Sequence, residues 1–419
     1  MSDALKASLS TPVALPQAAE VTSTAAPMPP PSERLVALDV FRGLTIAGML
    51  LVNDPGTWSA IYPPLDHAPW SGWTLTDLIF PFFLFIVGIT THLSLRKRRH
   101  EEMVPKILRR GLMIVLVGLL LNWFPFFWWG HIQGVPDPTF WQRVVHRLQN
   151  LRFSGVLQRI GVAYMIAALI SLRTTRRQMI TVIAAVLLGY WVVVMFVPVP
   201  GTGMIGAQVF DQPAKTLEAW VDQHVLGMNH IWAQSKDWDP EGVLSTIPAV
   251  CTALLGILAG QWIADKRRSL MERIAGLFAA GSLAMVAGSL WSWVFPINKN
   301  LWTSSYVVFC AGFACVTLAT CIWLVDVQHV TGWTKPFVVY GVNPLIAFAG
   351  SGLMARTIYS LWHVSVGGKS MSIQQASYQL GFAPFFPPKM ASLLWGLCFV
   401  LFWFGILIIL YRRRIIIKV

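Results

Sequence analysis

One histidine and one aspartate stand close together at the start of an apolar segment, in the stretch DHAPWSGWTLTDLIFPFFLFIVG at residues 66–88. His67 lies in a polar and aromatic loop, and Asp77 falls in the first turn of the helix that we predict to follow it. An unperturbed imidazole titrates at about pH 6.5 and can therefore exchange a proton at physiological pH. A nearby carboxylate can orient such a ring and stabilise its charge. The spacing predicts a proton-transfer site at the end of a helix bundle.

The composition places this site in a membrane protein. Of 419 residues, 55% are hydrophobic and 12% are charged, and the mean hydropathy is +0.59. Apolar runs of about 20 residues, joined by short polar links, predict an all-α polytopic membrane protein. The formal net charge of +13 does not point to nucleic acid, because Lys and Arg gather in the cytoplasmic loops of such proteins. All five cysteines lie in apolar runs without a C-x-x-C pair, so we expect neither a disulfide framework nor a metal site.

The apolar runs predict about ten transmembrane helices in one domain, residues 34–414, preceded by a disordered tail at 1–33 without signal-peptide features. Basic links such as RKRRHEEMVPKILRR and DKRRSLMER alternate with acidic or weakly charged ones. This alternation places both termini in the cytoplasm. Asn343-Pro344 predicts a break inside the ninth span. The predicted spans are residues 35–52, 75–95, 111–129, 155–172, 179–197, 243–263, 274–295, 304–325, 337–361 and 391–411.

Polar residues from distant parts of the chain converge in this topology. One group is expected at or near the outer ends of the helices: His67, Asp77, Arg159, Asp239, Glu241, Asn298 and Lys299. Arg42 and Asn343 are expected deeper, toward the cytoplasmic half, where an arginine suits contacts with phosphate. The longer loops and several tryptophans fit the membrane interface.

Each residue also has a simpler explanation. Asp77 can be a helix N-terminal acid favoured by the dipole, and Arg159 can snorkel to outer headgroups. Arg42 can pair with Asp39 on the same helix face. The residues of the DPEG sequence at 239–242 can cap the next helix, and Lys299 can anchor the chain at the interface. Composition and spacing leave enzyme and transporter equally open.

Longer motifs say more about function. The segments LDVFRGLTIAGMLLVN, HAPWSGWTLTDLIFPFFLFIVG, GVLQRIGVAY, DPEGVLSTIPAV and PINKNLWTSSYV follow one another along residues 34–360. In this order they resemble the successive signatures of the heparan-α-glucosaminide N-acetyltransferase family. The resemblance implies transfer of acetyl from cytosolic acetyl-CoA to a glucosamine amine across the membrane. It implies that His67 is the active histidine and that Asn53 is the family asparagine after the first span. It further implies a homodimer in the lipid bilayer.

The resemblance and the chemistry of acyl transfer together suggest roles. His67 acts as general base or as a transient acetyl carrier, and the sequence leaves both open. Asp77 orients the ring, while Asn53, Asn298 and Lys299 are candidate donors to the oxyanion or to the acceptor. Three residues are candidate cofactor contacts: Arg42, Arg159 and Asn343. Five residues are grouped with the acceptor site: Asp239, Glu241, Asn298, Lys299 and Trp302.

The chain also departs from the family pattern. It carries a short tail in place of a large lumenal domain, and a longer insert with Pro63-Pro64 precedes His67. These features predict a homologue in a bacterial inner membrane that acts on an amino sugar or glycan other than heparan. An amino-sugar transporter and an O-acetyltransferase for envelope polysaccharide are the alternatives.

Overall fold

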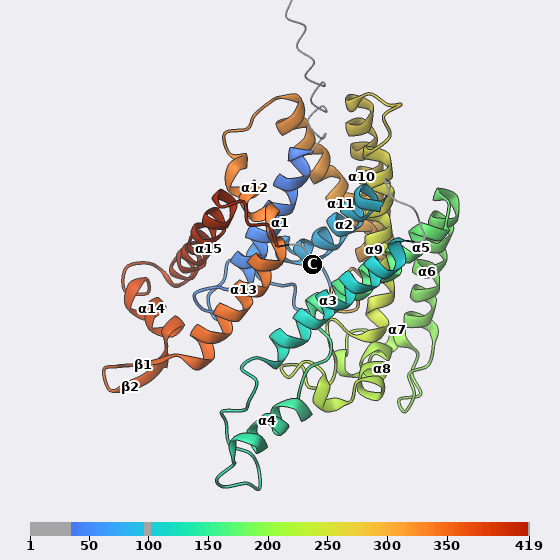
Figure 1. Ribbon diagram of the computed structural model, residues 1–419. Coiled ribbons are helices and arrows are strands. Elements are labelled where there is room, and N and C mark those ends of the chain that lie inside the picture. The colour runs from blue at the N-terminus through green and yellow to red at the C-terminus, as the bar shows by residue number, and fades with distance from the viewer. Residues whose placement is uncertain (1–34, 96–101, 418–419) are drawn as a thin grey trace, which may run out of the picture. The chain divides into compact units, whose positions relative to one another are not determined.

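A computed structural model describes residues 35–95 and 102–417 (Figure 1). This part is mostly helical and confirms the predicted all-α polytopic class. Eight of its helices are long and apolar enough to cross a bilayer. They are α1 (Val36–Asn53), α2 (Leu75–Leu95), α5 (Val156–Arg173), α6 (Arg176–Phe196), α9 (Val243–Ile263), α10 (Leu270–Trp291), α11 (Ser304–Ile322, extended by η4, Trp323–Val327) and α15 (Pro388–Arg412). The predicted tail and part of the first basic link lie outside the described residues.

The ninth predicted span is broken where the sequence indicated. Helix α12 (Thr334–Val342) and helix α13 (Pro344–Arg356), which η5 (Thr357–Leu361) extends, are bent by 83°. Pro344 has no backbone N–H to continue the hydrogen bonds of α12, so the helix restarts there. The predicted third span, 111–129, falls on α3 (Met103–Trp123). This helix starts earlier than expected, in the basic link, and ends before the aromatic cluster.

Several segments expected as loops contain short elements. The helical ones are α4 (Phe140–Gln149), α7 (Gly206–Val209), α8 (Leu217–Val225), α14 (Ile373–Gly381), η1 (Pro63–Leu65), η2 (Pro213–Lys215) and η3 (Met228–His230). Strands β1 (His363–Val366) and β2 (Lys369–Ser372) form an antiparallel hairpin in which Val366 pairs with Lys369. The two-residue turn is Gly367-Gly368, with φ of 58° and 78°. Positive φ at both positions is what such a tight hairpin turn requires.

Helices α2 and α9 pack closely, and this contact positions the candidate site. A Cβ atom on Gly88 would lie 2.1 Å from the carbonyl oxygen of Ala253, and one on Gly256 would lie 2.1 Å from that of Phe85. Only glycine permits this approach, as is common between membrane helices. Buried side chains from α2, α5, α9 and α11 then form one continuous apolar cluster. The starts of α2, α5, α9 and α11 therefore have fixed relative positions.

Helix α1 joins this group to the C-terminal helices. It contacts α2 and α11 on one side and α12, α13 and α15 on the other. In Figure 1, α1 (blue) accordingly lies between α2 and the orange and red C-terminal helices. The loop after α1, which leads to His67, therefore starts at a junction between the two groups.

Candidate active site

The imidazole of His67 and the carboxylate of Asp77 are in direct contact. His67 Nδ1 lies 2.7 Å from Asp77 Oδ1. Because a carboxylate can only accept, Nδ1 carries the hydrogen and Nε2 keeps its lone pair. The Asp77 side chain is 1% exposed and that of His67 is 41% exposed. A buried acid therefore holds a ring that is partly exposed.

Asp77 also folds the loop back onto the helix start. Its Oδ2 accepts hydrogen bonds from the backbone N–H groups of Ala68 (3.0 Å) and Thr74 (3.1 Å). The hydroxyl of Thr74 donates to the backbone carbonyl of Asp66 at 2.6 Å. Thr74-x-x-Asp77 has the spacing of a capping box. One carboxylate oxygen caps the helix start and the other contacts His67, so the helix-capping explanation leaves the predicted catalytic role open.

Lys299 completes the contact from the other end of the chain. Its Nζ lies 3.0 Å from Nδ1 and 3.4 Å from Nε2 of His67, and 3.4 Å from Oδ1 of Asp77. Burial lowers the pKa of this amine, and the carboxylates of Asp77 and Glu241 partly oppose that shift. A cation thus stands beside the imidazole and its carboxylate. The three residues form one cluster, the His67–Asp77–Lys299 site.

The link that carries Lys299, between α10 and α11, is held by its own hydrogen bonds. The side-chain oxygen of Asn298 accepts from the backbone N–H of Leu301 at 2.9 Å. The backbone N–H of Asn298 donates to the hydroxyl of Thr303 at 3.0 Å. The Nδ2 of Asn298 is buried, with no partner among the described residues. Tyr306, in α11, donates to the backbone carbonyl of Asp77 at 2.5 Å. Lys299 is therefore presented from a rigid segment fastened to the start of α2.

A second polar cluster centres on Arg152. Its guanidinium contacts Asp239 at 2.5 Å and Glu241 at 2.5 Å, and Ser154 donates to the same aspartate. Burial acts to raise the pKa of Asp239, but the hydrogen bonds and charge of Arg152 hold it below its usual value. Asp239 and Glu241 are thus ion-paired at the start of α9. The charge of Glu241 also acts to raise the pKa of Lys299.

Buried acids of α8 support this second cluster. Asp222 accepts from the backbone N–H of Val243 at 2.9 Å and of Asp239 at 3.3 Å. Glu218 accepts from the Tyr190 hydroxyl at 3.0 Å. Burial raises the pKa of Asp222 and of Glu218 to about 7 in each case. Asp222 thus fastens α8 to the start of α9, and Glu218 fastens α8 to α6.

Arg159 and Trp302 contact each other inside the bundle. The guanidinium carbon of Arg159 lies 5.0 Å from the centre of the Trp302 ring, and the indole N–H donates to Thr252 at 3.1 Å. Arg159 also donates to the hydroxyl of Ser245. The two residues are 2% and 1% exposed. Neither is open to a ligand from solvent in this conformation, so their predicted ligand contacts stay predictions.

The two deeper residues have partners within the protein. Arg42 pairs with Asp39 at 2.5 Å, as the spacing in α1 indicated. Asn343 donates to the carbonyl of Ile415 at 2.9 Å and accepts from the N–H of Ile417 at 3.0 Å. The amide of Asn343 thus fastens the C-terminal segment to the α12–α13 break. The structure brings neither residue into contact with His67.

Asn53 is the last residue of α1 and is exposed. Within the described residues, no hydrogen bond involves its side chain. The loop after it is held by the C-terminal region, because Gln374 donates to the carbonyl of Gly56 at 2.6 Å and Tyr359 donates to that of Pro55 at 2.9 Å. The position of Asn53 relative to His67 therefore depends on the contacts that the C-terminal region makes with the loop between them.

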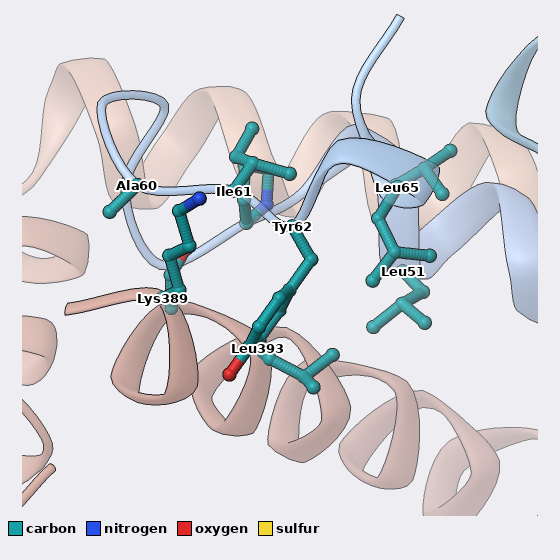
Figure 2. A pocket seen from close by; sticks show the side chains of 10 residues that line it. Leu51, Ala60, Ile61, Tyr62, Leu65, Lys389 and Leu393 are labelled. Carbon is teal, nitrogen blue, oxygen red and sulfur yellow. The ribbon is translucent and has the colours of Figure 1, made fainter. Parts of the chain in front are cut away.

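A small cavity lies between this loop and α15. Figure 2 shows Tyr62 reaching from the loop toward Leu393, with Lys389 at the start of the same helix. The volume of this cavity is ≈ 20 Å³. This is close to the space that a single water needs and too small for a sugar. The acceptor therefore has no preformed pocket at this place.

The sequence reasoning missed four positioning residues: Thr74, Arg152, Asp222 and Tyr306. Only Thr74 had a local signal, the capping-box spacing to Asp77. Arg152 meets its acids 87 and 89 positions away, so no short motif contains that contact. Of the predicted residues, the structure brings His67, Asp77 and Lys299 together, and it pairs Asp239 and Glu241 with Arg152.

Comparisons of the sequence with family models and with curated proteins point to one family. A family model described as "Heparan-alpha-glucosaminide N-acetyltransferase, catalytic" matches residues 34–296. A protein of that name from Mus musculus is 28% identical over 386 residues, which cover 80% of this chain and 56% of that protein. The Homo sapiens protein of the same name is 28% identical over 367 residues, which cover 76% and 52% respectively. The chain thus spans about half the length of the curated relatives it matches.

Proposed function

The chain belongs to the heparan-alpha-glucosaminide N-acetyltransferase family, and from that premise we propose that it is a membrane-embedded acetyltransferase. The donor in this proposal is cytosolic acetyl-CoA, and the acceptor is an amino sugar on the periplasmic side of a bacterial inner membrane. Both termini then lie in the cytoplasm, and the functional unit is a homodimer. The observation that carries the proposal is the 2.7 Å contact between His67 and Asp77, with Lys299 beside both.

The proposed reaction uses the free Nε2 of His67 as a base. The acceptor nitrogen attacks the thioester carbonyl carbon while Nε2 takes up the amine proton. The tetrahedral intermediate then collapses, the carbon–sulfur bond breaks, and the proton passes from the imidazole to the thiolate of CoA. Asp77 keeps the hydrogen on Nδ1 throughout and stabilises the imidazolium. The same free nitrogen could instead accept the acetyl group itself, which gives a two-step route.

Lys299 serves in this scheme as a donor to the oxyanion. Its Nζ is 3.4 Å from Nε2 of His67, so the carbonyl oxygen of a thioester held at Nε2 would lie near the ammonium group. A preorganised cation is most effective where charge develops in the transition state. Asn53 and the unpartnered Nδ2 of Asn298 are further candidate donors. Asp239, Glu241 and Trp302 remain proposed acceptor contacts, and Arg42, Arg159 and Asn343 remain proposed donor contacts.

Replacing Lys299 with methionine tests this role. Lys299→Met is expected to reduce kcat on the order of 10²- to 10³-fold, as for loss of one oxyanion donor, with little change in KM. Lys299→Arg, which keeps the charge, should retain more activity. Steady-state kinetics in detergent or liposomes would measure both. A higher KM at unchanged kcat would show that Lys299 only binds the acceptor.

The overall function is tested with purified protein in proteoliposomes. We expect release of free CoA that requires both acetyl-CoA and an amino sugar, with the acetyl group recovered on the sugar nitrogen. A panel of amino sugars, each matched with its N-acetylated or amine-free counterpart, would identify the acceptor. Uptake of unmodified sugar without CoA release would contradict the proposal and favour a transporter. Acetyl recovered on a hydroxyl would favour O-acetyl transfer.

A further inference from the structure

The short helix α4 and the aromatic residues before it play no part in the proposed reaction. α4 spans Phe140–Gln149 with the sequence FWQRVVHRLQ. Thr139 caps its first turn in a reciprocal pair with Gln142, so the helix starts at a defined residue. In Figure 1 it lies beyond the end of α3, joined to it by the segment 124–139. This segment contains Phe124, Phe126, Phe127, Trp128 and Trp129.

The cationic face of α4 is turned toward α3. Arg147 donates to the carbonyl oxygens of Asn122 at 2.7 Å and of Phe124 at 3.1 Å. Arg143 donates to the carbonyl of Trp128 at 3.0 Å. The carbonyl groups at a helix C-terminus lack partners within the helix and attract cations. Arg147 therefore fastens α4 to the end of α3, and Arg143 fastens it to the link that follows α3.

The apolar face of α4 points the other way. Trp141, Val145 and Leu148 recur at the spacing of one helix face, opposite Arg143 and Arg147. They are 72%, 49% and 40% exposed. An amphipathic helix in water normally turns this face toward the protein. Here the protein binds the arginine face, and Ile132 and Val135 of the preceding link approach the apolar one. The three apolar side chains stay largely exposed, so something else must cover them.

The residues around α4 indicate that the lipid bilayer covers its apolar face. Helix α3 itself exposes an apolar stripe that includes Leu112, Leu116 and Leu120. This stripe runs to the end of α3, where Arg147 of α4 is bound. In a polytopic membrane protein such a stripe faces lipid. Aromatic residues concentrate where the chain leaves the lipid core, and α4 follows such a cluster. Its sequence has no acid, which suits the phosphate groups of lipids.

We propose that α4 is an interfacial helix whose Trp141–Val145–Leu148 face is embedded at the boundary of headgroups and acyl chains. Arg147 holds it at that depth through the end of α3, and Arg143 holds it through the link that follows α3. This inference depends on the membrane class of the protein and not on the proposed acetyl transfer. Its partner is a lipid surface.

Spin labels on α4 of the reconstituted full-length protein test the proposal. Trp141→Cys, Val145→Cys and Leu148→Cys would each carry a nitroxide, with His146→Cys as the control on the polar side of the same helix. The native exposed thiol, Cys398, is replaced by serine in the parent. Collision with dissolved oxygen reports the lipid phase, and collision with a water-soluble nickel chelate reports the aqueous phase.

We expect the oxygen-to-nickel collision ratio at 141, 145 and 148 to exceed that at 146 by about threefold or more, as for a helix lying in the interface. Val145→Cys is the mildest of these changes and keeps the test valid if the tryptophan variant fails to fold. Equal nickel access at all four positions would overturn the proposal. Immobile labels with short distances between two protein copies would also overturn it, because a second copy would then cover the face.

Discussion

His67→Ala is expected to abolish acetyl transfer while the protein inserts and folds normally. Removing the imidazole removes the base that takes the amine proton, or the atom that carries acetyl in the two-step route. General-base catalysis contributes about 10²- to 10⁴-fold, so kcat should fall by that factor. Asp77 keeps Lys299 and the N–H groups of Ala68 and Thr74 as partners, so the protein should stay folded with a stability loss of about 1 kcal/mol, as for one lost hydrogen bond. Acceptor-dependent CoA release and the thermal unfolding midpoint measure the two effects.

A second histidine provides the control for this variant. His224 is exposed, and its Nδ1 contacts only the carbonyl of Trp220 at 2.8 Å. His224→Ala should therefore keep near-normal turnover. If His67→Ala also kept it, the assignment of the active residue would be wrong. Acetyl label on the wild-type protein before acceptor is added would favour the two-step route.

Asp77→Asn should cost nearly as much activity as loss of the histidine. The asparagine can keep accepting from Ala68 and Thr74, which bond the oxygen Oδ2 in the native protein. Its NH₂ group would then face Nδ1 of His67 and donate to it, so the hydrogen of the ring moves to Nε2. In Ser-His-Asp triads the same exchange of tautomer costs about 10⁴-fold in kcat. We expect a loss on the order of 10²- to 10⁴-fold, measured as kcat under saturating donor.

The adjacent acid gives a matched comparison. Among the described residues, the side chain of Asp66 accepts only from the backbone N–H of His67, at 2.8 Å. Asp66→Asn makes the same chemical change one residue from the ring and should leave most of the activity. Comparable losses in the two variants would mean that loop stability matters and that orientation of the ring does not. A full loss in Asp66→Asn alone would contradict the role given to Asp77.

The sequence went far toward the fold because membrane helices are specified locally. Their backbone polar groups must be satisfied within the segment, so apolar run length predicted α1, α2, α9 and α15 closely. Asn343-Pro344 predicted the break between α12 and α13 for the same local reason, the missing N–H of proline. The extended start of α3 was missed, because helical bonding continued into a basic link that hydropathy counts as outside.

The candidate site likewise has one contact that the local sequence specifies and others that depend on helix packing. The contact between His67 and Asp77 lies within a single loop and helix start, so the spacing of the two residues was sufficient to predict it. Lys299 reaches the ring across 232 positions of sequence, and Arg152 meets Asp239 across 87. Those contacts depend on how α2, α9 and α11 pack, which in turn depends on the close approach at Gly88 and Gly256. The sequence by itself determined a membrane bundle with an oriented histidine at one helix end, because short-range hydrogen bonding fixes both. Only the tertiary structure decided which cation stands beside that histidine and which acids are already paired, since close packing selects those partners over long distances.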